Sequence, residues 1–137
     1  MPRVVVDAGV LVAALISRTG TPARLLLQWL EGAFDLLVSP RLLSELDAVL
    51  AREQFRRYFT VRQSSAFVAL LQERGVFVPD PESDTPRTRD PEDDYLVALA
   101  ESASADVIVS GDKDLTELVN PSVPVLTPRD LLDRLQR

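Results

Sequence analysis

The sequence predicts an α/β sandwich built on a mainly parallel, helix-covered sheet. The first observation behind this prediction is an alternation of short Val- and Ile-rich runs with longer stretches of helical periodicity. The second is the composition: 137 residues, of which 46% are hydrophobic and 26% charged, have the size and usage of one globular domain. We therefore expect residues 1–137 to form a single domain.

Each strand is predicted from a short apolar run that ends at a polar or turn residue. The first run ends at Asp7, and the fourth ends at Ser110. Pro124 removes a backbone N–H from the last run, which makes that strand an edge strand. The sequence thus predicts about five strands, at Val4–Val6, Phe34–Val38, Val76–Val78, Val107–Val109 and Val123–Leu126.

Capping residues and glycines delimit the predicted helices. Ser39 followed by Pro40 is typical of a helix start, and Asp90 followed by Pro91 repeats this pattern. Gly75 ends a long helical stretch. The expected helices are residues 10–16, 23–30, 40–53, 55–74, 90–104, 114–119 and 130–136, with a loop at residues 79–89.

The chain contains no His and no Cys, which limits its chemistry. It has no Ser–His–Asp triad, no thiol nucleophile, no disulfide and no thiolate zinc site. An enzyme of this composition must use carboxylates, hydroxyls, Lys, Arg, Tyr or a bound hard cation.

The net charge of −6 makes the chain a poor nonspecific ligand for nucleic acid. Lys113 is the only lysine, so nearly all positive charge is Arg, which suits bidentate contacts with phosphate. The sequence has no signal-peptide apolar region and no apolar run of the about 18 residues that cross a membrane. We therefore expect a cytoplasmic protein without membrane association.

Two acidic residues directly follow predicted strands. Asp7 follows the first strand, and Asp112 follows the fourth after a Ser-Gly pair. Ligands of parallel α/β sheets bind outside the carboxyl ends of the strands, so these two carboxylates are candidates for one site. The alternative for either one alone is a turn or a helix cap.

Two more acids are singled out by helical geometry. Glu45 lies at the rim of the apolar stripe of its helix, where an ordinary boundary residue is the alternative. Asp90 fits the N-cap and Asp93 the third position of a capping box, which leaves Asp94 without a structural role. Asp94 opens a helix that is apolar nearly all round and is therefore expected to be buried.

Convergence of Asp7, Glu45, Asp94 and Asp112 would require a cation or protons. Two carboxylates ~5 Å apart at an effective dielectric of ~20 repel by roughly 3 kcal/mol. Several such pairs would be a large share of a domain stability of about 5–15 kcal/mol. Ligands that are all oxygen favour Mg²⁺ or Mn²⁺, and these ions support phosphodiester hydrolysis by water without His.

The order of these acidic segments resembles the PIN-domain family, and most closely the VapC-like toxin components of bacterial toxin–antitoxin pairs. The resemblance extends over nearly the whole chain, in the segments VVVDAGV, SPRLLSEL, DPEDDYLVALA and VSGDKDL. It implies a three-layer α/β/α fold and Mg²⁺- or Mn²⁺-dependent ribonuclease activity. It also implies an antitoxin partner and a homodimer.

The matched motifs imply roles for individual residues. The catalytic and metal-binding acids would be Asp7, Glu45, Asp94 and Asp112, with accessory residues Ser110, Asp114 and Asp93. Gly9 departs from the pattern, because many members have Asn there, whose amide helps to order the site. The sequence therefore leaves open whether the site is less ordered, or the activity weaker, than in the members that have Asn at this position.

Four arginines are candidates for RNA contacts. Arg56 and Arg57 lie among aromatic residues, a combination that can hold single-stranded RNA, although a solvated helix face has the same pattern. Arg87 and Arg89 precede the helix of Asp94, where phosphate contact and a plain loop are both open.

Two other functions also remain open. Gly9 allows a catalytically weak module that only binds RNA or an antitoxin. A phospho-acceptor receiver domain has this length and acids at strand ends, but it needs a paired acid after the first strand, where Asp7 stands alone.

Overall fold

A single parallel sheet forms the centre of the molecule. The computed structural model describes residues 1–82 and 90–137. Its strands have the order β3-β2-β1-β4-β5, and every neighbouring pair is parallel. They are β1 (Arg3–Val6), β2 (Asp35–Val38), β3 (Val76–Phe77), β4 (Val107–Val109) and β5 (Val125–Leu126). The parallel α/β sheet predicted from the sequence is confirmed, and the strand after Pro124 lies at an edge.

All the predicted helices are present, but several bounds differ. The helix predicted to run to residue 53 ends at Leu50, and the one predicted to end at residue 119 ends at Thr116. The prediction of a helix that starts at Phe55 is wrong, because Thr60 and Gln63 form a capping box that starts the helix at Val61. The helical elements are α1 (Ala8–Ile16), α2 (Thr21–Leu30), α3 (Pro40–Leu50), the 3₁₀ turn η1 (Glu53–Phe55), α4 (Val61–Arg74), α5 (Pro91–Ser102), α6 (Lys113–Thr116) and α7 (Pro128–Leu135).

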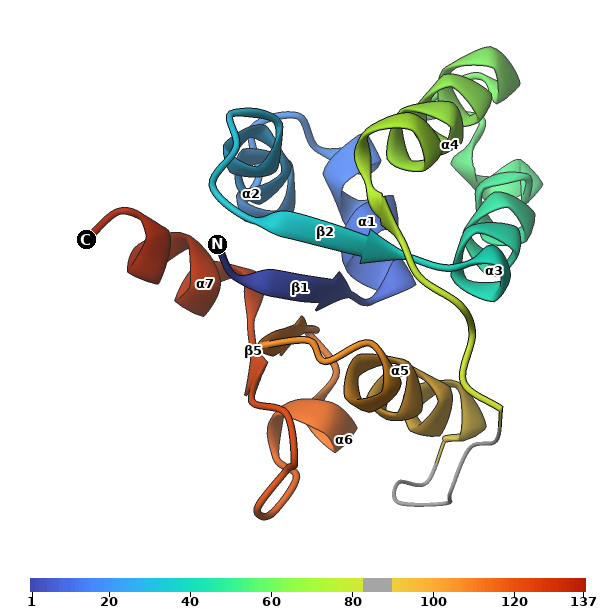
Figure 1. Ribbon diagram of the computed structural model, residues 1–137. Coiled ribbons are helices and arrows are strands. Elements are labelled where there is room, and N and C mark those ends of the chain that lie inside the picture. The colour runs from blue at the N-terminus through green and yellow to red at the C-terminus, as the bar shows by residue number, and fades with distance from the viewer. Residues whose placement is uncertain (83–89) are drawn as a thin grey trace.

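Helices cover both faces of the sheet, which gives the expected three-layer α/β/α fold (Figure 1). One face packs against α1, α2, α3, α4 and α7, and the other against α5 and α6. Alternate residues of a strand point to opposite faces. Val4 and Val6 of β1 therefore belong to the first core, whereas Val5 belongs to the second core together with Tyr95.

The strand order reverses between β1 and β4. The chain adds β2 and β3 on one side of β1 and then returns to place β4 on the other side. A crevice at the carboxyl ends of the strands is expected at such a reversal. Val6 pairs with Val109, so the segments that follow β1 and β4 begin side by side at this point.

Among the described residues, no single helix is both long and apolar enough to cross a membrane. Within residues 1–82 and 90–137, only α1 and α2 taken together reach that length and composition, and they are bent by 101° at their junction.

Candidate metal centre

Asp7 lies at the carboxyl end of β1, where it also caps α1. Its backbone N–H donates to the carbonyl oxygen of Val109 at 2.9 Å, next to the β1–β4 pairing. Its carboxylate accepts from the Gly9 N–H at 3.3 Å and from Ser110 Oγ at 2.9 Å. These bonds hold the carboxylate at the reversal point of the sheet.

Ser110 connects two acidic residues and is itself fully buried. Its hydroxyl donates to Asp7 Oδ2 and accepts from the Asp112 N–H at 3.0 Å. Asp112 in turn caps α6, where its Oδ1 accepts from the N–H of the exposed Asp114 at 2.9 Å. A single hydroxyl thus sets the spacing of Asp7 and Asp112.

Asp93 joins this group from the first turn of α5. Asp90 caps the helix by accepting from the Glu92 N–H at 2.9 Å, and Asp93 lies three residues later, on the same side. Oxygens of Asp90, Asp93 and Asp112 lie within 4.8 Å of one another. Asp93 is 5% exposed, and its Oδ2 is buried without a hydrogen-bond partner among the described residues. A cation would satisfy such an oxygen.

The environment of Asp93 disfavours its charged form. Burial, together with the charge of Asp112 and a side-chain hydrogen bond to it, raises the pKa of Asp93 from 3.8 to about 7. The charges of Asp90 and Asp7 act in the same direction. Around neutral pH this group therefore holds a proton for part of the time, and a bound cation would replace that proton.

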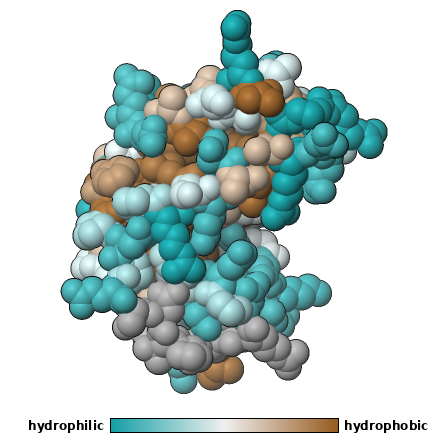
Figure 2. Space-filling model, turned by 90° about the vertical axis from the view of Figure 1, so that its right-hand side faces the viewer, coloured by the Kyte–Doolittle hydropathy of each residue, from teal (hydrophilic) through white to brown (hydrophobic). Residues whose placement is uncertain are grey.

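A cleft of about 480 Å³ opens beside these residues, and we refer to it as the acidic cleft. This volume is within the range of about 300–1,000 Å³ that is typical of ligand sites. Hydrophilic side chains predominate on the face that carries α3, α4 and the start of α5 (Figure 2). The acidic cleft is lined by Asp7, Asp90, Glu92, Asp93 and Asp112. Residues of α1, α3 and η1, which include Ile16, Val49 and Phe55, also line it, as does Arg52 just before η1.

The structure brings only some of the predicted acids together. Asp7 and Asp112 both line the acidic cleft, but within the described part of the chain Asp94 does not. Successive helical residues project about 100° apart, and Asp93 takes the side that faces the cleft. The sequence predicts Asp93 only as an accessory residue and Asp90 only as a cap. Their spacing of three residues is the sequence feature that indicates a shared face.

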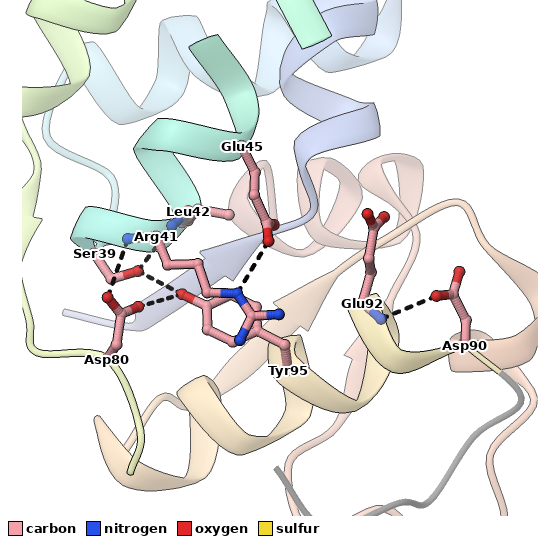
Figure 3. A network of polar contacts seen from close by, with 8 residues as sticks. All are labelled: Ser39, Arg41, Leu42, Glu45, Asp80, Asp90, Glu92 and Tyr95. Carbon is pink, nitrogen blue, oxygen red and sulfur yellow. Dashed lines mark hydrogen bonds and ion pairs between the residues drawn. The ribbon is translucent and has the colours of Figure 1, made fainter. Parts of the chain in front are cut away.

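Glu45 is held by an arginine between α3 and α5, and among the described residues it does not line the acidic cleft. Arg41 Nε donates to Glu45 Oε1 at 3.0 Å. The same guanidinium lies 3.9 Å from the ring centre of Tyr95 in α5. Figure 3 shows Glu45 extending from α3 to the Arg41 guanidinium over Tyr95, while Asp90 and Glu92 lie farther along, at the start of α5.

The candidate RNA-binding arginines differ in their surroundings. Arg56 donates to the carbonyl oxygen of Leu50 at the end of α3, and its guanidinium lies over the Phe59 ring. Arg57 is exposed and lies over Tyr58. Neither residue lines the acidic cleft as the described residues form it. Arg87 and Arg89 lie outside the described residues.

The chain is similar to proteins of one family. The family model described as PIN domain matches residues 3–114. Uncharacterized protein MJ1680 of Methanocaldococcus jannaschii is 24% identical over 144 residues, which cover 98% of this chain and 92% of that protein.

Two solved structures have a similar fold. One is VapBC2 from Rickettsia felis, in a complex with a DNA fragment from the VapBC2 promoter. It superposes with a TM-score of 0.64 and 10% identity, and the match covers 91% of this chain and 98% of that chain. FitAB bound to an IR36 DNA fragment superposes with a TM-score of 0.53 and 17% identity over 91% of this chain and 94% of that chain.

Proposed function

Because the chain belongs to the PIN domain family, we propose that it is a Mg²⁺- or Mn²⁺-dependent endoribonuclease that hydrolyses phosphodiester bonds. One observation carries the proposal: Asp93 Oδ2 is buried without a hydrogen-bond partner in the part of the chain that the structure describes, close to Asp112 and Asp90 at the point where the strand order reverses. A buried carboxylate with a purely structural role would accept a hydrogen bond or pair with a basic side chain at that place.

Asp90, Asp93 and Asp112 fit a hard cation, since the atoms that they offer to it are all carboxylate oxygens. We assign the binding of the ion to Asp7, Asp93 and Asp112, with Asp93 in the role that the sequence motif suggested for Asp94. We also retain Glu45 of α3 as the further ligand that the motif suggested. When bound, such an ion lowers the pKa of a water molecule and stabilises the leaving oxygen. Ser110 keeps the carboxylate of Asp7 and the backbone of Asp112 in register before the ion binds.

Cleavage of single-stranded RNA by the purified chain tests this function. We expect cleavage with Mg²⁺ or Mn²⁺, none with EDTA, and a loss of at least about 100-fold in Asp7→Asn. Outer-sphere partners of a metal contribute about 10- to 100-fold, so a direct ligand should contribute no less. Cleavage that persists both in EDTA and in Asp7→Asn would show that the site is assigned wrongly.

A catalytically weak binding module is the alternative that Gly9 favours. Among the described residues, a Cβ atom added at Gly9 would meet no atom within 4 Å beyond its own chain neighbours and helix backbone, so the start of an Asn side chain has room there in Gly9→Asn. Calorimetric titration with Mn²⁺ separates the two functions, because the binding module alone predicts no Mn²⁺ binding at millimolar concentration. If the chain is a nuclease, we expect both the wild type and the Gly9→Asn variant to bind Mn²⁺.

Arg52 and Phe55 support RNA as the substrate. They line the acidic cleft, where a guanidinium can meet phosphate and an aromatic ring can stack on a base. The Phe55 ring is itself stacked on Phe59, at a centroid distance of 5.8 Å and an interplanar angle of 12°. This packing gives a base a fixed surface.

We expect the double variant Arg52→Met, Phe55→Leu to bind single-stranded RNA about tenfold more weakly or worse, since stacking contributes about 1–3 kcal/mol per base. Fluorescence anisotropy in an Asp7→Asn background measures binding without cleavage. The matched control is Arg57→Met, Tyr58→Leu, an adjacent exposed pair of the same chemistry. Equal losses in both variants would argue against a contact in the acidic cleft.

We further propose that the chain is the toxin of a toxin–antitoxin pair, that it binds an antitoxin protein and that it forms a homodimer. The likeness of its fold to VapBC2 of Rickettsia felis and to FitAB supports the first part of this proposal. Co-expression with the protein encoded by the neighbouring reading frame tests it, because a cognate antitoxin should relieve growth arrest and co-purify.

A further inference from the structure

Arg41 connects α3 to Asp80 through its backbone and to Tyr95 of α5 through its side chain (Figure 3). Its backbone N–H donates to Asp80 Oδ2 at 3.0 Å, and its Nε donates to Glu45 Oε1 at 3.0 Å. Its guanidinium lies over Tyr95, with the central carbon 3.9 Å from the ring centre. Arg41 therefore binds Glu45 while it contacts a residue of α5.

The Tyr95 ring is a rigid support for this guanidinium. Tyr95 is 1% exposed, its hydroxyl donates to Asp80 Oδ1 at 2.5 Å, and it lies 2.6 Å from Ser39 Oγ. It also lies two residues after Asp93 in the same helix. The position of Arg41, and with it that of the Glu45 carboxylate, is thus tied to the helix that supplies Asp93.

From these contacts we infer that Arg41 is a positioning residue for metal binding, which holds the carboxylate of Glu45 in place beside α5, the helix that supplies Asp93. The inference rests on the proposed function and extends it to a residue that touches neither the ion nor RNA in this role. A planar guanidinium fixed on an aromatic ring restrains a carboxylate more closely than a mobile ammonium group does.

The sign of one measurement separates positioning from a general charge effect. Removal of a positive charge close to acidic residues would, by electrostatics alone, strengthen the binding of a divalent cation. Loss of a hydrogen-bonding partner that orients a ligating carboxylate weakens metal binding, typically 10- to 100-fold. Only the positioning role predicts weaker binding.

The experiment measures Mn²⁺ affinity from the electron paramagnetic resonance signal of free Mn²⁺, without RNA. We expect Arg41→Met to weaken Mn²⁺ binding about 10- to 100-fold. In a Glu45→Gln background the same substitution should have no further effect, because its target is then lost. The matched control is Arg129→Met, which removes another i,i+4 ion pair, with Asp133 on α7, and should leave the affinity unchanged.

Unchanged or tighter Mn²⁺ binding by Arg41→Met overturns the inference, as does an equal loss in the Glu45→Gln background. If Arg41→Met does not fold, Arg41→Lys provides the test, since Lys keeps the charge and loses the planar fork. Weaker Mn²⁺ binding by that variant supports positioning, and wild-type affinity overturns it. A wild-type chain that binds no Mn²⁺ instead overturns the proposed function itself.

Discussion

Asp93→Asn is expected to abolish metal-dependent RNA cleavage, with a loss of at least about 100-fold, whereas Asp94→Asn keeps most of the activity. The reason is geometric, because Asp93 lies with Asp90 and Asp112 in the acidic cleft and its neighbour, among the described residues, does not line it. Single-turnover cleavage rates at saturating Mn²⁺ measure the difference. The pair is closely matched, since both side chains are buried in the same helical turn.

The Asp93→Asn substitution should also stabilise the metal-free protein at neutral pH. The introduced amide cannot carry a charge and can donate a hydrogen bond to Asp112, so both repulsion and burial of charge are relieved. Thermal unfolding in EDTA measures this effect. A loss of activity together with a loss of stability would indicate misfolding rather than removal of a ligand. An Asp94→Asn variant less active than Asp93→Asn would contradict the assignment.

The metal-free wild type should lose stability as the pH rises from about 4 to about 7. Asp93 has a folded-state pKa of about 7, above its ordinary value of 3.8, because of burial and the neighbouring acids. In this window the folded state holds a proton that the unfolded chain has released, so the free energy of unfolding falls as the pH increases. The contribution of Asp93 is complete below a pH of 3.8 and is lost as the pH rises through about 7.

Chemical denaturation at pH about 4.5 and about 7.5 in EDTA measures this change, with Asp93→Asn as the reference protein. We expect the wild type to lose on the order of 2 kcal/mol more than the variant across this range. Mn²⁺ should act in the opposite direction, because it binds the deprotonated carboxylates and stabilises the folded state most at the higher pH. If the difference in free energy of unfolding between the wild type and the variant is the same at both pH values, Asp93 is not the titrating group.

The strands and the strand-end acids can be predicted from the sequence because their evidence is local. Each strand is a short apolar run, and both Asp7 and Asp112 closely follow the place where such a run ends. The helix boundary before α4, which begins at Val61, is not predicted by such local runs. The residues around η1 keep an apolar pattern that resembles a continuing helix. The capping box at Thr60, which is visible in the sequence, is the stronger evidence for a boundary.

Two features of the candidate site depend on details that the sequence pattern does not resolve. Asp93 and Asp94 are adjacent, and a rotation of about 100° decides which one faces Asp112. The contact of Arg41 with Tyr95 joins residues of two different helices, and no periodicity predicts it. Local patterns therefore indicate which chemistry is present, whereas packing of distant segments decides which side chains carry it.

The hydrogen bond between Ser110 and Asp7 joins residues separated by 103 positions. β4 can occupy its place beside β1 only after residues 1–109 have left the ribosome, since its residues come last among the central strands. A nascent chain shorter than this has no assembled acidic cleft. The order of synthesis thus delays assembly of the acidic cleft until Asp112 has been added and has left the ribosome together with the residues before it.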